Sequence, residues 1–444
     1  MSTCLEMNTS ILPGQAGLGA GVRAAPVSLK RNTVWTMAGN TAYAATQWLQ
    51  VAVIARLGST LDVGHYAFAL GLCTPVFMLA NLQLRPMQAT DSLRRYTFGD
   101  YLGLRLVTTL GALAVTLALA CAFAGSLQNG LLVAVVGISK SFESVSDVYQ
   151  GLFQQHERMD RVGLSLLLKS ALILPVFGLL YYHTANLACA VTGVAFVHLT
   201  TLLTYDTQAS HWVLHGSGAP GLHAPFRVLE RPRFHSATLR KLAKRALPLG
   251  ITMMLISLHA NAPRFIIDKY VGASGLGIFA AIAYLSMAGA IIVTAAGSAA
   301  APRLAACAAR RDARGFRNLL AKLVVLAAAL GIASVTASLW FGRSLLRSLY
   351  GEEYAQYDHV LAWSMAAGGI SCITSMFGYA ATALGRFGGQ AWALALAIAI
   401  LLGAATYLVP GSGLTGVAIA TVISSTTCLC AYISLVFWRM NDES

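Results

Sequence analysis

Long apolar segments alternate with short polar ones along most of this chain, and none of them shows the strict alternation of a membrane-spanning strand. About 20 apolar residues cross a bilayer as a helix, and the lack of water there requires every backbone polar group to be paired. We therefore expect an all-α polytopic membrane protein. Twelve spans are predicted: 32–55, 63–84, 101–124, 130–152, 162–182, 185–206, 246–267, 275–299, 318–341, 359–382, 389–409 and 413–437.

Two longer polar segments divide the chain. Residues 1–31 lack the short apolar core of a secretory signal and are expected to form a cytoplasmic tail. Residues 207–245 are rich in Gly, Pro, His, Lys and Arg, and this basic linker separates an N-lobe, 32–206, from a C-lobe, 246–437. Residues 438–444 form a second tail. Within the linker, Ser236 to Arg245 is predicted to form a short amphipathic helix on the membrane surface.

The two lobes carry a weak internal repeat. The first span ends in Ile54-Ala-Arg-Leu-Gly58, followed by Gly64-His-Tyr66, and the seventh ends in Ile267-Asp-Lys-Tyr-Val-Gly272, followed by Gly277-Ile-Phe279. Each unit reads as a helix, a glycine turn and a second helix that opens on Gly-x-aromatic. Repeats of six helices that begin on the same side are parallel, and such transporters bind substrate between the repeats near the middle of the membrane.

Charge is scarce but unevenly placed: the 444 residues are 57% hydrophobic and 11% charged, with a formal net charge of +14. Most Lys and Arg fall in one alternating set of connections, whereas the other set holds only Arg56, Lys269, Arg343 and Arg347. Positive residues accumulate on the cytoplasmic side, so both termini are expected there. This topology and attraction to anionic lipid account for the positive charge without nucleic acid.

Motifs for catalysis or cofactor binding are absent. The sequence contains no G-x-x-x-x-G-K-[ST], G-x-S-x-G or H-E-x-x-H, which makes an enzyme improbable. The eight cysteines have no C-x-x-C spacing and are expected to pack in the spans. His211 and His215 have the spacing of a zinc pair on a helix but no third ligand, so we expect neither a metal site nor another cofactor.

The fourth span carries three ionisable residues, Lys140, Glu143 and Asp147. Their spacing places them on one face of a helix, where all three can face one cavity. Ionisable groups inside a membrane are costly and usually functional, and acidic groups in wet sites bind protons or sodium, so Glu143 and Asp147 are candidates for ion coupling. A structural ion pair between Lys140 and Glu143 is the alternative.

Other spans supply further cations. Lys169 follows in the fifth span, Arg105 lies near one end of the third, and Arg264 lies near the end of the seventh. Each could bind an anionic substrate. The alternatives are that Arg105 extends to the membrane surface and that Arg264 pairs with Asp268, four residues on.

Polar uncharged residues mark the first and seventh spans. The first carries Asn40, Gln47 and Gln50, and the seventh carries Asn261 just before Pro263. These amides either line a cavity, where Pro263 permits a gating bend, or form hydrogen bonds between helices.

Several of these residues lie in segments that resemble a known family. The run Asp147-Val-Tyr-Gln-Gly-Leu-Phe-Gln-Gln-His-Glu-Arg-Met-Asp160 with Lys169-Ser170 resembles the central segment of the polysaccharide-transporter family, the O-antigen and capsule flippases. Arg31-Asn-Thr-Val-Trp35, Pro263-Arg-Phe-Ile-Ile-Asp-Lys-Tyr270 and Leu384-Gly-Arg386 are also similar. The resemblance extends over residues 30–440, but the long linker departs from the family pattern.

The resemblance implies a member of the multidrug/oligosaccharidyl-lipid/polysaccharide exporter superfamily, with two six-helix lobes around a central cavity. It implies movement of an undecaprenyl-diphosphate-linked oligosaccharide across a bacterial inner membrane by alternating access, coupled to an ion gradient, with a polysaccharide polymerase or chain-length protein as partner. The diphosphate would then bind the cations, Lys140, Lys169, Arg264 and Arg105. Sugar hydroxyls would bind the amides, Asn40, Gln47, Gln50 and Asn261.

Two other functions remain compatible with the sequence. A multidrug exporter of the same superfamily would share the fold but bind cationic drugs. A membrane glycosyltransferase or polymerase would have large outer loops, whereas the outer connections here are short, the longest running from about Arg343 to Asp358.

Overall fold

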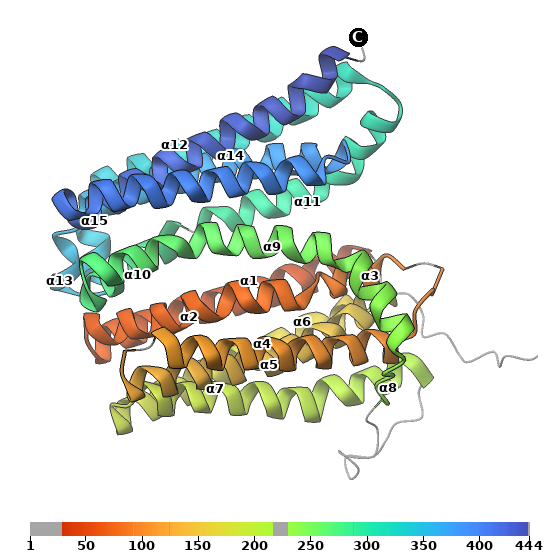
Figure 1. Ribbon diagram of the computed structural model, residues 1–444, viewed down its shortest axis with the longest axis horizontal. Coiled ribbons are helices and arrows are strands. Elements are labelled where there is room, and N and C mark those ends of the chain that lie inside the picture. Colours follow the sequence, from red (N-terminus) through yellow and green to blue (C-terminus); the bar gives the residue numbers. More distant parts are fainter. Residues whose placement is uncertain (1–28, 92, 124, 216–229, 287, 443–444) are drawn as a thin grey trace, which may run out of the picture.

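The structure is a computed structural model that describes residues 29–91, 93–123, 125–215, 230–286 and 288–442. Within these ranges every regular element is a helix, which confirms the predicted all-α class. Figure 1 shows the helices running roughly parallel in two groups, with α9 at the boundary.

The N-lobe contains the helices before the linker: α1 Leu29–Leu57, α2 Thr60–Asn81, α3 Leu84–Ala89, α4 Phe98–Phe123, α5 Leu127–Gln155, α6 Met159–Thr184, α7 Leu187–Thr201, the π-helical turn η1 Leu202–Asp206 and α8 Thr207–His215. The C-lobe contains α9 Ser236–Tyr270, α10 Ala273–Ser286, α11 Ala288–Ala309, α12 Ala313–Leu349, α13 Glu352–Ala355, α14 Asp358–Ala383 and α15 Phe387–Asp442.

The predicted spans correspond to these helices with shifted ends. Nine helical runs among the described residues are long and apolar enough to cross a membrane. The helices α1 and α5, which carry the polar residues noted above, are not among the nine because that polarity lowers their hydropathy. The predicted eighth span is extended to Ala309 by α10 and α11, and α15 contains the last two spans around a kink at Gly413, where φ is +53°.

The linker is more helical than predicted at both ends. The sixth span continues through η1 into α8, which ends at His215. The segment Ser236–Arg245 is not a separate surface helix but the first part of α9. Leu242 and Ala246 are buried in a cluster with Leu82 and Tyr101, so this segment packs onto the N-lobe. Residues 216–229, like the tail up to residue 28, lie outside the described residues.

The internal repeat is visible as two equivalent helix pairs, α1–α2 and α9–α10. Ser59 caps α2 through a reciprocal pair of hydrogen bonds with Asp62, and Gly272 precedes α10 with φ of +91°, a conformation that favours glycine. Both second helices then bring their aromatic residue, Tyr66 or Phe279, to the same central cavity.

The two repeats meet at Gly64 and Gly277. A Cβ atom at Gly64 would lie 1.8 Å from the carbonyl oxygen of Ala273, and one at Gly277 would lie 1.9 Å from that of Thr60. The contact is therefore reciprocal, since each helix places its glycine on the first turn of the other. Close backbone approach of this kind is the usual role of small residues in membrane helix packing.

Further contacts join the lobes at the same end. Arg56 of α1 donates from Nε to the carbonyl oxygen of Leu349 at 3.0 Å, at the last turn of α12. Trp48 Nε1 donates to Tyr350 Oη at 2.8 Å. Cations stabilise helix C-termini, so Arg56 reinforces this closed end.

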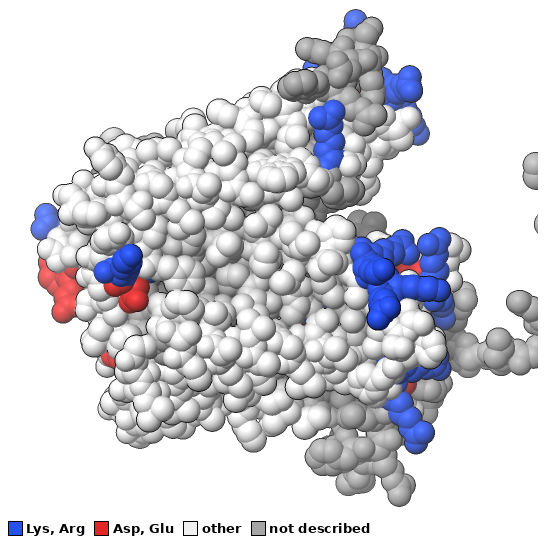
Figure 2. All heavy atoms as spheres, in the orientation of Figure 1, with Lys and Arg blue, Asp and Glu red and all other residues white. Residues whose placement is uncertain are grey.

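The opposite end is basic and open. Figure 2 shows Lys and Arg gathered at the right-hand end, where α9 begins and α15 ends, and shows the molecule hollowed there between its upper and lower parts. The lobes thus approach each other at one end and separate at the basic end.

Candidate functional site

A cavity of about 570 Å³ lies between the lobes. Helices α1, α2, α5, α6 and α7 of the N-lobe and α9, α10, α11, α14 and α15 of the C-lobe contribute to its lining. Its volume is within the range of pockets for small molecules. Of the lining side chains, Lys140, Glu143 and Arg264 carry formal charges.

Lys140 and Glu143 share the N-lobe wall. Lys140 Nζ lies 2.8 Å from Glu143 Oε2, and both side chains are about a quarter exposed. The two readings of this pair are therefore not exclusive: it is an ion pair, and it faces the cavity. A negatively charged ligand that bound Lys140 would compete with Glu143 for its ammonium group.

A hydrogen-bonded chain extends this pair to residues that the sequence analysis missed. Tyr43 Oη donates to Glu143 Oε1 at 2.9 Å and lies 3.3 Å from His198 Nε2. His198 Nδ1 lies 3.1 Å from Ser139 Oγ. A histidine inside the sixth span was the available signal, since such residues usually have a polar partner.

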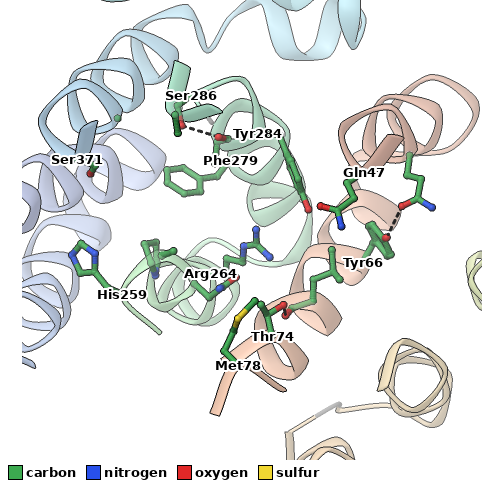
Figure 3. Close-up of a pocket in the computed structure, with 18 of the residues that line it drawn as sticks. Gln47, Tyr66, Thr74, Met78, His259, Arg264, Phe279, Tyr284, Ser286 and Ser371 are labelled. Carbon is green, nitrogen blue, oxygen red and sulfur yellow. Dashed lines mark hydrogen bonds between the residues drawn. The ribbon is translucent and has the colours of Figure 1, made fainter. Parts of the chain in front are cut away.

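Arg264 projects from α9 into the space bounded by Tyr284, Gln47 and Thr74 (Figure 3). Its Nη1 donates to the carbonyl oxygen of Ala67, across the lobe boundary, at 3.0 Å. The predicted alternative, a salt bridge to Asp268, is not formed: no ion pair between described residues includes Arg264. The cavity therefore holds one cation with no carboxylate partner in the described part of the chain.

The predicted amides divide into two groups. Gln47, Gln50 and Asn261 line the cavity, and Asn40 is exposed on α1 outside it. Asn261 donates to the carbonyl oxygen of Ser257 at 2.8 Å. Gln50 accepts from Tyr66 Oη at 3.2 Å, but its buried Nε2 has no partner among the described residues.

Asp147 does not share the site of Glu143. It pairs with Arg105, whose Nη2 lies 2.9 Å away, and with Arg85, whose Nη1 lies 3.6 Å away. Arg105 is fully buried and also contacts Asn81, so it does not extend to the membrane surface. Neither Asp147 nor Arg105 is among the lining residues, and their roles in coupling and substrate binding remain predictions.

Lys169 is also outside the lining, in a buried network between α5, α6 and η1. Its Nζ lies 3.5 Å from Asp206 Oδ2 and contacts Ser146 Oγ, and Ser165 Oγ donates to Asp206 Oδ1 at 2.8 Å. Asp206 was not predicted from the sequence as the partner of Lys169. Because the two charged side chains are at most 2% exposed, this geometry favours a structural role for Lys169, and its role in substrate binding remains a prediction.

Replacing Lys169 by methionine is expected to destabilise the protein by about 3–5 kcal/mol, because Asp206 would be left buried and unpaired. A lower melting temperature of the purified K169M variant would measure this. The matched control is K169M/D206L, which removes both charges and should recover much of the loss. A K169M variant that melts like the wild type would contradict the structural role.

No group of three or more His, Cys, Asp or Glu side chains suited to a metal ion occurs in the described ranges.

Solved structures of transporters share this fold. A MATE transporter from Vibrio cholerae matches with a TM-score of 0.62 and 15% identity, covering 92% of this chain and 98% of that one. A MOP superfamily transporter from Pyrococcus furiosus matches with a TM-score of 0.61 and 16% identity, covering 93% and 94%. These similarities confirm the predicted architecture of twelve spans in two lobes.

Sequence comparison identifies the family within this fold. The capsular polysaccharide biosynthesis protein CapF of Staphylococcus aureus is 25% identical over 405 residues, which is 90% of this chain and 98% of CapF. Residues 29–307, more than half of the chain, match the family described as polysaccharide biosynthesis protein. The chain therefore belongs to this polysaccharide biosynthesis family.

Proposed function

We propose that this protein is a flippase that moves an undecaprenyl-diphosphate-linked oligosaccharide across the bacterial inner membrane. The observation that carries the proposal is Arg264, which faces a cavity between two lobes and has no carboxylate partner among the described residues. A diphosphate is recognised by a guanidinium group in a site sheltered from bulk water. The similarity to a capsular polysaccharide biosynthesis protein supports a lipid-linked glycan as the substrate.

The charge distribution supports export from the cytoplasm as the direction of transport. We place the basic end, which is also the open end in Figure 2, at the cytoplasm. The cavity would then receive a substrate made on the cytoplasmic side. Closure of the basic end and separation at the Gly64–Gly277 contact would expose the cavity to the outer side, which is the alternating-access cycle.

For coupling to an ion gradient we favour Glu143 over Asp147. Glu143 lines the cavity and has one cationic partner, whereas Asp147 lies between two arginines outside the lining. If Glu143 carries the coupling ion, translocation in sealed vesicles should stop when an ionophore collapses the gradient, and the E143Q variant should not respond to that ionophore. An ionophore response in E143Q equal to that of the wild type would assign coupling elsewhere.

A multidrug exporter is the second candidate, because solved MATE structures share the fold. The cavity charge disfavours it. Two of the three formally charged lining residues are cations, and the one acidic residue is already paired with Lys140. The net positive charge of the cavity would repel a cationic drug, whereas it would attract a diphosphate.

Deletion of the gene should stop surface polysaccharide, whether O-antigen, exopolysaccharide or capsule, and leave unpolymerised lipid-linked repeat units on the cytoplasmic side. Such repeat units could not reach a polysaccharide polymerase or chain-length partner outside. Extraction of lipid-linked glycans and their accessibility to an added glycosidase in right-side-out and inverted vesicles would locate them. Normal surface polysaccharide in the deletion strain, together with a gain in sensitivity to cationic drugs, would favour the exporter.

A further inference from the structure

One wall of the cavity consists only of small, uncharged side chains. The helix α14 lines it with Ser364, Ala367, Gly368, Ser371, Cys372 and Ser375, and α15 adds Thr421 and Ser425. We call Ser364, Ser371, Ser375, Thr421 and Ser425 the hydroxyl wall. These residues could not be predicted as a site from the sequence, since Ser and Thr are common in membrane helices, where they form hydrogen bonds with carbonyl groups of their own helix.

Helical spacing explains why these hydroxyl groups gather. Ser364, Ser371 and Ser375 are seven and four residues apart, which places them on one face of α14. Thr421 and Ser425 are four apart on α15. Ser371 Oγ and Ser425 Oγ lie 3.3 Å apart, so the two faces join into one surface. Gly368, between Ser364 and Ser371, also lines the cavity, and a Cβ atom there would lie 3.3 Å from the Cβ of Ser286 on α10.

The wall keeps unused hydrogen-bonding capacity. Ser375 and Thr421 donate to carbonyl oxygens of their own helices at 2.9 Å, which leaves the lone pairs of both hydroxyls free to accept. Ser364 is 7% exposed and its Oγ has no partner within the described residues. Across the cavity, the Nε2 of Gln50 is also buried, and no described residue forms a hydrogen bond with it. Buried polar groups are normally paired, so we expect these two groups to form hydrogen bonds with a ligand that has both donors and acceptors.

We propose that the hydroxyl wall binds the sugar rings of the oligosaccharide while Arg264 binds its diphosphate. This inference rests on the proposed flippase function and divides its cavity into two subsites. A sugar hydroxyl is at once donor and acceptor, as the wall requires, and needs no charged partner. Side chains no larger than threonine leave room for a sugar ring beside α14 and α15. A diphosphate would find no cation on α14 or α15 in the lining.

The test compares two lipids on the purified protein: the lipid-linked oligosaccharide extracted from the deletion strain, and undecaprenyl diphosphate without sugar. The wild type should bind the oligosaccharide lipid more tightly. The S364A/S371A variant should lose about tenfold in affinity for it, because two neutral hydrogen bonds disappear. Its affinity for undecaprenyl diphosphate should not change.

Two further variants separate the wall from general effects. S371L fills space at the wall and should also weaken binding of the oligosaccharide lipid alone. The matched control is S334A/S338A on α12, where both hydroxyls donate to carbonyl oxygens of their own helix and neither lines the cavity. It should bind both lipids as the wild type does.

Each outcome has one meaning. Three outcomes would overturn the hydroxyl wall as a sugar subsite. The wild type could bind the two lipids with equal affinity, or S364A/S371A and S371L could keep the full preference for the oligosaccharide lipid. The third outcome is that these variants lose affinity for both lipids in parallel. Failure of the wild type to bind either lipid would instead contradict the proposed function.

Discussion

Replacing Arg264 by glutamine should abolish export of surface polysaccharide. The side chain faces the cavity and donates a hydrogen bond to the backbone carbonyl of Ala67, but it forms no ion pair with a described residue, so its charge is available to a ligand. Truncating one member of a sheltered, hydrogen-bonded charge pair costs about 2–5 kcal/mol, which is about thirtyfold or more in affinity. Affinity of the purified R264Q variant for undecaprenyl diphosphate, with surface polysaccharide in a complemented deletion strain, would measure both effects.

Two controls accompany R264Q. R264K keeps the charge but not the planar pair of donors, so we expect an intermediate affinity. R343Q removes the same charge at an exposed position of α12 outside the cavity lining and should transport normally. An R264Q variant that binds undecaprenyl diphosphate like the wild type would remove Arg264 from the site.

Alanine at Gly64 or Gly277 is expected to force the lobes apart at the end opposite the basic connections. The new Cβ would lie 1.8 Å or 1.9 Å from a carbonyl oxygen of the partner helix, so the backbones must separate by about 1 Å or more. The conformation that is open at the basic end depends on this contact and should lose population. Distances between spin labels at the exposed positions Leu61 and Ser274 should increase, and export should fall.

Gly111 provides the matched control. It lies within α4, and nothing lies within 4 Å of the position that its Cβ would occupy. G111A makes the same gain in helix propensity as G64A without a collision, so neither the label distance nor export should change. Unchanged label distances and full export in both G64A and G277A would show that this contact does not restrain the lobes.

The broad architecture could be predicted because lipid imposes it: length and hydropathy predict the spans, and glycine turns predict the repeat. It was harder to predict which residues inside the spans lie together. Lys140, Glu143 and Asp147 share a helix face, yet Asp147 lies one turn further along α5, about 6 Å by helix rise. At that depth α3 and α4 close over α5, and Arg85 and Arg105 take up the carboxylate. Spacing within one helix does not reveal which neighbours enclose each turn.

Contacts with residues that are distant in the sequence explain other differences between the predicted and the observed site. Lys169 meets Asp206 only because the π-helical turn after α7 brings that carboxylate to α6, and no sequence signal predicted the turn. Asn40 shares α1 with Gln47 and Gln50 but lies outside the cavity lining, nearer the basic end of the helix. Arg264 was predicted as a ligand from its type and position, and the structure adds that Asp268 does not neutralise it.

That unneutralised arginine has an electrical consequence. A diphosphate carries more negative charge than one guanidinium cancels, and Lys140 already shares its charge with Glu143. The loaded cavity would therefore remain net negative as it changes sides. In a cell whose interior is negative, moving such a complex outward releases about 2.3 kcal/mol per elementary charge for each 100 mV. Membrane voltage would then favour loaded transport in addition to any ion coupled at Glu143, and the return of the empty cavity, with Arg264 facing it, would carry the opposite charge.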